Sequence, residues 1–323
     1  IFNPDPPLLD AGFHIEISSA GLDVPSNPNV EFESGLYRGR REIRPGYYVP
    51  SGNIVFPINV RAIGYFLKWA LGGYKFTDGG IGANTHELWG SEETELPSFT
   101  THLGKDAFEH VFTGTTINSL QIEIGGDWLL CTIDCVAGKD YKQPLKEIGD
   151  LQLFDEKTLT FIAAGVQFNS VGYNCKVQNM TINISNNIDT AGGKGIGTRY
   201  ACRFPAGARN IDLSGNLHFI DETEYVKYWG SNQGIHDTNS PGSEPITITI
   251  DGGTAGSLEL KFPKIQYTDI GASPSGRAPI THSFSAYAVV DEVAMKDSSI
   301  LHTEMLATLV NQNEDMTLPS PGS

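Results

Sequence analysis

The sequence of 323 residues is poor in basic side chains, in cysteines and in long apolar runs. It contains 22 Lys and Arg against 38 Asp and Glu, which gives a formal net charge of −16 at pH 7. Because phosphate binding requires clustered Lys and Arg, this balance argues against a surface that grips nucleic acid. The most apolar stretch, residues 63–71, is interrupted by Lys68 and is far shorter than the roughly 20 residues that span a bilayer. The composition favours a soluble acidic protein with no membrane insertion.

The sequence also lacks the spacings that carry catalysis or metal binding. Its four cysteines form no CxxC pair, and its eight histidines show no metal-ligand spacing. Residues 192–197, GGKGIG, lack the GxxxxGK[ST] order of a phosphate-binding loop and are typical of a loop between strands. No GxSxG elbow is present. We therefore predict a protein that is not an enzyme and has no cofactor and no metal.

What the chain does contain is a pattern that returns about half a chain length later. Ser51–Phe56 reads SGNIVF, and Ser214–Phe219 reads SGNLHF. The sequence Ile-x-Ile-Ser occurs at residues 15–18 and again at 182–185. Two domains of about 160 residues fit the usual size of a single core. The repeat predicts two related domains, residues 1–150 and residues 151–323.

Glycine (36), proline (18) and alternating apolar and polar residues indicate strands and turns rather than long helices. In the first half we expect strands at 13–18 and 52–56, a helix capped by Asn59 over 60–71, and a hairpin over 117–136. In the second half we expect strands at 181–185, 246–250, 258–262 and 281–288, with a helix at 222–229. Residues 297–310 fit either a strand or a helix.

The predicted fold is mainly β, with two tandem related domains of β-sandwich or half-barrel type and one short packed helix in each. We expect an N-terminal arm before the first domain and a C-terminal arm after the second. Residues 77–96 are expected to form a long polar insert without secondary structure, a kind of loop that is usually functional or disordered. Residues 139–156 are expected to be the domain linker.

These signals, in this order, resemble the tail tube proteins of long-tailed bacteriophages, specifically the two-domain type. The segments that carry the resemblance are 39–56, 67–72, 96–100 (LPSFT), 113–120 (TGTTINSL), 134–139 (DCVAGK), 182–187, 197–200 (GTRY), 214–217 and 260–265 (LKFPKI). Thr115 stands where many relatives are expected to have cysteine.

The resemblance implies a structural virion protein, the major subunit of the tail tube. Three chains would form a trimeric, pseudo-hexameric ring of six domains, and such rings would stack into a hollow channel for viral DNA. It implies self-association in the ring and between rings. It also implies contacts with a tape measure protein, a tail terminator and tail-tip proteins, and DNA that passes without specific binding. The expected location is the virion tail, after assembly in the host cytoplasm.

Alternation along the strands, read with this resemblance, gives two sets of candidate residues. Those expected to face the lumen are His14, Glu16, Gln121, Glu123, Thr132, Asp134, Asn183, Glu259 and Lys261. Those expected in an inter-ring loop are Asp78, Gly79, Trp89, Glu92 and Glu93.

Two other hypotheses fit the composition. A secreted two-domain β-sandwich adhesin or lectin would have a signal peptide in the full gene and an aromatic-lined sugar pocket. A tube protein of a cellular secretion machine would usually be single-domain, and the internal repeat argues against it.

Overall fold

The computed structural model describes residues 13–25, 29–33, 40–80, 84–145, 158–173, 175–218, 222–229, 242–271, 281–313 and 315–316. The strands and helices of the first half are β1 (Ser19–Ala20), β2 (Asn29–Glu33), β3 (Arg40–Pro45), β4 (Ser51–Pro57), α1 (Val60–Leu71), β5 (Gly72–Thr77), β6 (Asn84–Gly90), β7 (Phe99–Lys105), β8 (Phe108–Ile124), β9 (Leu130–Val136) and β10 (Lys139–Gln143). Those of the second half are β11 (Ala164–Phe168), β12 (Val171–Gly172), β13 (Val177–Ser185), β14 (Asn210–His218), α2 (Thr223–Trp229), β15 (Ser243–Asp251), β16 (Gly256–Gly271), β17 (Thr281–Ala288), β18 (Asp291–Ala294), β19 (Ile300–Thr303) and β20 (Leu306–Asn311). The fold is therefore mainly β, as predicted.

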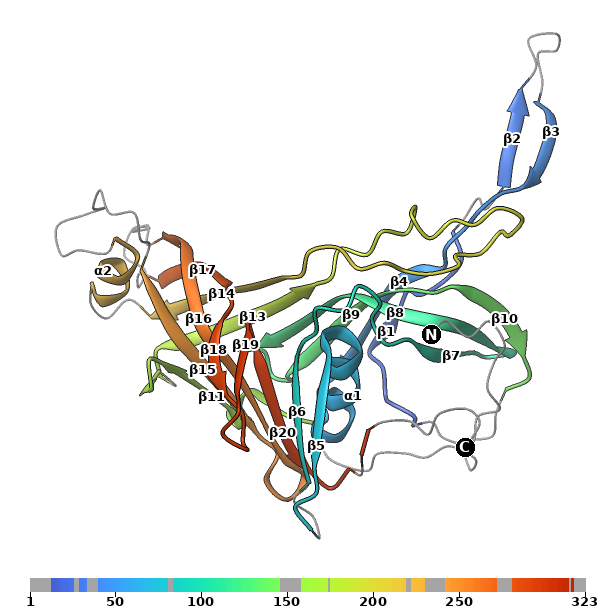
Figure 1. Cartoon of the computed structure of the whole chain (residues 1–323). Helices are drawn as coiled ribbons and strands as arrows, with labels where there is room; N and C mark the ends of the chain where they lie inside the picture. The colour runs from blue at the N-terminus through green and yellow to red at the C-terminus, as the bar shows by residue number, and fades with distance from the viewer. Residues whose placement is uncertain are drawn as a thin grey trace.

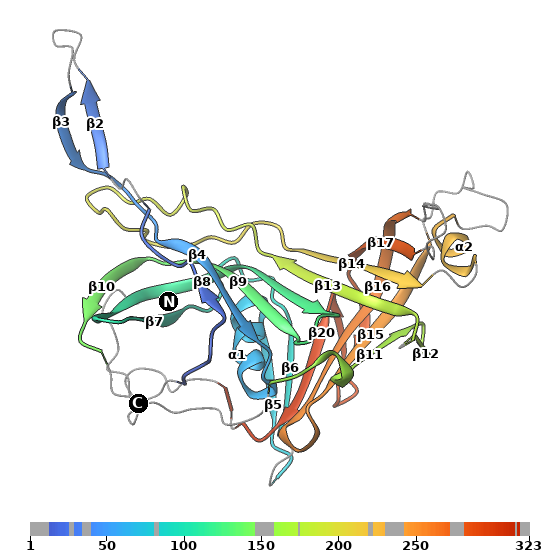
Figure 2. The same cartoon turned by 180° about the vertical axis from the view of Figure 1, so that it is seen from behind.

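Most of the strands belong to one antiparallel sheet that curls around a shared interior (Figures 1 and 2). Its main path runs β4-β9-β8-β13-β14-β17-β16, so β8 of the first half pairs directly with β13 of the second. The long strand β16 then pairs with β20, β20 with β6, and β6 with β5. Strands of the first half thus return to lie beside strands of the second.

Helix α1 lies inside this curl and is the centre of the core. The Asn59 side chain caps it by accepting a hydrogen bond from the backbone N–H of Arg61 at 2.8 Å, and Gly72 ends it with φ +85°. Its residues Ile63 and Leu67 are fully buried. The largest hydrophobic cluster joins them to residues of both halves, including Leu120 and Leu260. The main core is therefore common to the two halves.

The two halves pair their strands in the same order. The order β1-β4-β9-β8 in the first half is matched by β13-β14-β17-β16 in the second. In each half the second of these strands carries the Ser-Gly-Asn motif and is followed by a helix. The repeated sequence motif therefore occupies the same place in two sub-sheets with the same connectivity.

The glycine of this motif is required by close approach of the neighbouring strand in both halves. A Cβ on Gly52, which has φ +153°, would lie 2.2 Å from the carbonyl oxygen of Gly21, just after β1. A Cβ on Gly215 would lie 2.5 Å from the carbonyl oxygen of Asn179 in β13. Only glycine fits where a neighbouring backbone comes this close.

The helix at 60–71, the 117–136 hairpin and the strands at 52–56, 181–185, 246–250, 258–262 and 281–288 are confirmed, and the second helix spans Thr223–Trp229. The strand expected at 13–18 is wrong: only an isolated bridge at His14 forms there, and the short β1 begins after it, at Ser19. The linker expected over 139–156 begins too early, because residues 139–143 form β10 and pair with β8. The segment 297–310, for which the sequence allowed a strand or a helix, contains the strands β19 and β20.

The expected terminal arm at 1–12, residues 146–156 of the linker and the tail at 317–323 lie outside the described residues. Within the described part of the chain, no helix is long and apolar enough to cross a bilayer.

Candidate functional site

The outer surface of the path from β4 to β16 is a continuous polar face. The strand register places its side chains in three rows that cross the sheet. The first row runs from β4 to β16 and contains Val55, Thr132, Gln121, Asn183, Asp212, Tyr287 and Gln266. The second runs from β9 to β16 and contains Leu130, Glu123, Thr181, Ser214, Ser285 and Asp269. The third runs from β4 to β14 and contains Asn53, Asp134, Ser119, Ser185 and Asn210. We call these three rows the polar face.

The opposite surface of the same strands is the core. Leu120 and Ile122 of β8 and Ile133 of β9 are fully buried, as are the thiols of Cys131 and Cys135, whose pKa values are raised by burial. Period-2 alternation with one buried face leaves the other face for solvent or for a partner. The faces predicted for the 117–136 hairpin are therefore confirmed.

All charged side chains in the three rows are carboxylates. They are Glu123, Asp134, Asp212 and Asp269, and the rows contain no Lys or Arg. Glu123 accepts a hydrogen bond from Gln121 Nε2 at 2.6 Å, and Asp134 accepts one from Asn118 Nδ2 at 3.0 Å. Such a surface repels phosphate and offers no cation with which to bind it.

The polar face gathers five of the candidate lumen residues: Gln121, Glu123, Thr132, Asp134 and Asn183. It also contains two carboxylates that sequence reasoning missed. Asp212 could have been found from the alternation in β14, whereas Asp269 follows a register shift in β16 that breaks the period-2 pattern.

Four candidate lumen residues lie elsewhere. His14 and Glu16 are exposed in the irregular segment before β1. Glu259 and Lys261 form an ion pair at 2.7 Å in the first part of β16, where the strand pairs with β15 and β20 rather than with β17. They are not brought together with the polar face.

The prediction that residues 77–96 lack secondary structure is wrong. Residues 84–90 form β6, which is held between β5 and β20, and Trp89 is half-buried in it. Asp78 and Gly79 lie in the exposed turn that joins β5 to β6, of which residues 81–83 are outside the described residues. The polar residues of β6 are buried with distant partners: Glu87 accepts a hydrogen bond from the backbone N–H of Lys296 at 2.6 Å.

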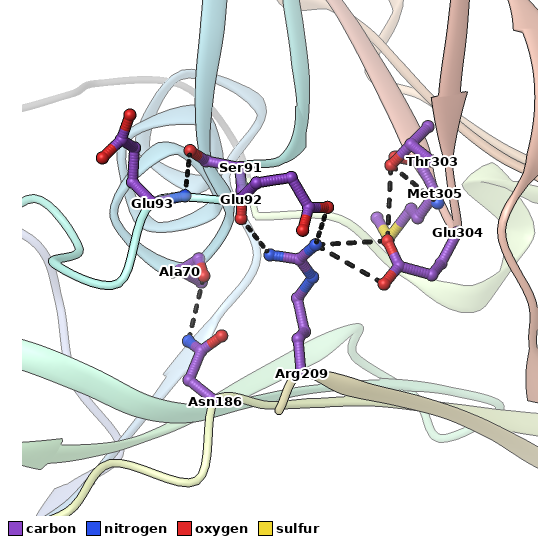
Figure 3. Close-up of polar contacts among 9 residues, drawn as sticks. All are labelled: Ala70, Ser91, Glu92, Glu93, Asn186, Arg209, Thr303, Glu304 and Met305. Atoms are coloured by element: carbon purple, nitrogen blue, oxygen red, sulfur yellow. Dashed lines mark hydrogen bonds and ion pairs between the residues drawn. The ribbon is translucent and has the colours of Figure 1, made fainter. Parts of the chain in front are cut away.

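Glu92 and Glu93 lie in the loop after β6, which is held by a largely buried arginine of the second half (Figure 3). Arg209 donates from Nη1 to the carbonyl oxygen of Ser91 at 2.8 Å, and its Nη2 lies 3.3 Å from Glu304 Oε2 and 3.9 Å from Glu92 Oε1. The side chains of Arg209 and Glu304 are 10% and 15% exposed, whereas Glu92 is 94% exposed. Arg209 thus joins the loop after β6 to the β19–β20 turn.

A long arm, residues 186–209, connects β13 to β14, and Arg209 is its last residue. At its first residue, the Asn186 side chain donates to the carbonyl oxygens of Ala70 at 2.9 Å and Ile117 at 3.0 Å (Figure 3). Both ends of the arm are therefore fixed to the body of the protein by buried side chains. Sequence reasoning anticipated a loop around residues 192–197 but gave no signal for either anchor.

Comparison with protein families gives one match that covers most of the chain. The model of the family described as phage tail tube protein matches residues 27–288, which is most of the chain. The chain belongs to the phage tail tube protein family. No curated protein matches it.

Family membership makes this tail tube protein a structural, non-enzymatic subunit of the virion tail, as the resemblance implied. Among the described residues of this tail tube protein, no group of three or more His, Cys, Asp or Glu is arranged to hold a metal ion.

Proposed function

We propose that three copies of this tail tube protein close into a ring of six related halves, and that such rings stack into the channel through which viral DNA leaves the particle. In this proposal the polar face lines the channel. The observation that carries it is a face of four carboxylates, without Lys or Arg, on the outer side of a continuous sheet.

An internal duplication supports the trimer. The two halves pair their strands in the same order and carry the same Ser-Gly-Asn motif, so we infer that they descend from one repeated unit. The pairing of β8 with β13 joins the halves within a chain. A similar joint between the second half of one chain and the first half of the next would close a ring by a heterologous interface and leave fewer sheet edges exposed.

A carboxylate-lined wall suits passage of DNA without binding. Each Lys or Arg that contacts a phosphate releases counterions and adds about 0.9 to the steepness with which log K of binding falls with log salt concentration. Even a few Lys or Arg side chains per ring would therefore hold the duplex. In the proposed tail the tube also contacts a tape measure protein, a tail terminator and tail-tip proteins. Assembly takes place in the host cytoplasm.

The test is to replace Glu123, Asp134 and Asp212 together with Lys and to measure genome ejection from assembled particles at several salt concentrations. We expect complete tails from which ejection is at least tenfold slower at low salt and recovers as salt screens the new charges. The matched control replaces the same three residues with Gln, Asn and Asn, which removes charge without adding bases, and should eject normally. Ejection by the Lys variant at the wild-type rate in low salt would exclude the polar face as the channel wall.

Ring formation has its own measurement. Purified wild-type protein should form rings of three subunits in negative-stain micrographs and by mass measurement in solution. A stable monomer at high concentration, or a ring of six chains, would contradict the trimer.

A further inference from the structure

Helix α1 is packed between the two halves of the chain. It lies against β8 of its own half and also against β16 and β20 of the second half. Arg61 of α1 donates from Nε to Asn313 Oδ1 at 2.7 Å, and Asn313, just after β20, donates from Nδ2 to the carbonyl oxygen of Arg61 at 3.0 Å. A Cβ on Gly64 would lie 2.4 Å from the side chain of Leu309 in β20, so the helix and the strand are in close contact. The joint between the halves is therefore a docked helix as well as the pairing of β8 with β13.

Helix α2 has the corresponding place in the chain but not the corresponding cover. It follows the Ser-Gly-Asn strand β14, as α1 follows β4. Figures 1 and 2 show α1 inside the curl of the sheet and α2 at one outer end of the molecule. Among the described elements, the main contact of α2 is with β16 of its own half. In the described part of the chain, α2 thus rests mainly on its own half, whereas α1 rests on both.

The side chains of α2 divide between two sides of the helix. Lys227 donates from Nζ to Glu244 Oε1 at 3.0 Å, and Tyr228 packs against the main core. At 3.6 residues per turn, Val226 and Trp229 lie on the opposite side of the helix from these two residues. Both Val226 and Trp229 are half-buried. The side of α2 that faces away from its own half is therefore partly apolar.

A three-stranded lobe of the first half corresponds to the strands of the second half that receive α1. The lobe consists of β7, the first part of β8, and β10. Strand β10 comes after β9 and pairs with the first part of β8, as β20 comes after β17 and pairs with the first part of β16. Strands β7 and β15 pair with the other edges of these same parts of β8 and β16. The first half thus contains a counterpart of the surface on which α1 docks.

One face of this lobe carries apolar side chains and a base. The strand register places Leu103, Phe108 and Lys142 on the face of the lobe that contains His110 and Phe112. Leu103 and Phe108 are half-buried, and Lys142 is exposed, with its Nζ 4.8 Å from the centroid of the Phe108 ring. Because Phe112 belongs to the main core, this face corresponds to the core side of β16, on which α1 packs. We call Leu103, Phe108 and Lys142 the receiving face.

We infer that α2 of one chain docks on the receiving face of the next chain in the ring, with Val226 in the contact. This inference rests on the proposed function, because it concerns how chains meet within a ring. The contact repeats between chains what α1 and the second half form within one chain. Figures 1 and 2 show α2 and β10 at opposite ends of the molecule, so the contact is heterologous and can close a ring. Glu222, exposed about one turn before Val226, and Lys142 of the receiving face add opposite charges to the two surfaces.

The experiment uses two variants that each place a base on one side of this contact. The helix variant is Val226→Lys, and the face variant is Phe108→Lys. The matched control, Ile300→Lys, places the same base at an exposed isoleucine of β19. Each protein is purified as full-length chain and checked for the wild-type circular dichroism spectrum, and the mass of its assemblies is measured by light scattering. If either variant loses that spectrum, Val226→Ser or Phe108→Ser takes its place.

We expect the wild type and the control to form rings of three chains, and each variant alone to remain a monomer at the concentration at which the wild type is fully assembled. An equal mixture of the two variants should give complexes of two chains and none of three. This follows because the intact α2 of the face variant meets the intact receiving face of the helix variant, whereas the other joint of that pair carries both substitutions. Rings of three chains from either variant, or no complexes of two chains in the mixture, would overturn the inference. Wild-type protein that stays monomeric would instead contradict the proposed function, and the inference with it.

Discussion

Arg209 offers a direct test of what holds the two halves together. Its guanidinium contacts Glu304, with both side chains almost buried, and the carbonyl oxygen of Ser91. Replacing Arg209 with Met leaves the Glu304 carboxylate without its cation and the carbonyl without its donor. Breaking one partner of a buried pair costs about 3 to 5 kcal/mol, and the residual exposure here favours the lower end. We expect Arg209→Met to lower the free energy of unfolding by about 3 kcal/mol.

The two carboxylates near Arg209 should differ sharply, although both are within 4 Å. Glu92 is 94% exposed and lies 3.9 Å away, so Glu92→Gln should change stability by less than about 0.5 kcal/mol. Adding Glu304→Leu to Arg209→Met should recover about 1 to 2 kcal/mol, because the double variant no longer buries an unpaired charge.

Urea denaturation followed by circular dichroism, on unassembled full-length chain, measures these differences as shifts of the midpoint at unchanged slope. The reasoning is refuted if Arg209→Met costs less than about 1 kcal/mol, or if Glu92→Gln costs as much as Arg209→Met. It is also refuted if Glu304→Leu destabilises the Arg209→Met chain further.

Two further predictions concern the repeated motif and a buried histidine. Gly52→Ala should lower the free energy of unfolding by about 3 kcal/mol or more, because its Cβ would lie 2.2 Å from a backbone oxygen. The control Gly172→Ala, with no atom within 4 Å of the new Cβ, should lower it by less than about 1 kcal/mol. Similar melting temperatures for the two variants would contradict the close-approach explanation. Burial lowers the pKa of His86 in the folded protein below the value of 6.5 that it has in the unfolded chain. As the pH falls from 6.5 toward the lower pKa of the folded state, the unfolded chain binds a proton that the folded chain does not, so stability decreases. His86→Gln should remove part of this slope between pH 7.5 and 5.5 in thermal melts, and an unchanged slope would show that other groups cause it.

The sequence predicted those elements whose signal is local. The 117–136 hairpin has strict alternation and a glycine-rich turn, and α1 has its Asn59 cap, an apolar face and a terminal glycine, so each could be recognised without its partners. The same alternation predicted most of the polar face correctly within that hairpin. It could not show that β13 lies beside β8, because strand pairing between halves leaves no local mark.

Residues 84–90 show why the rest could not be predicted. Thr85, His86 and Glu87 look like loop residues, yet they are buried because Lys296, Tyr74 and Asn311 supply their hydrogen bonds. Most of these partners lie more than 200 residues away. A polar strand whose partners are so distant reads as solvent-exposed in the sequence alone.

The pairing of β8 with β13 has a kinetic consequence for the proposed ring. A ring of six separate subunits would need five bimolecular encounters, each dependent on protein concentration, before the last joint closes it. Because one joint in every two is already made within the chain, its effective concentration is set by the covalent connection and not by the amount of protein present. Three such chains need only two bimolecular encounters before the ring closes, so the rate of ring formation should follow a lower power of subunit concentration. Fusing the halves thus lets a tail begin to assemble while its subunit is still scarce.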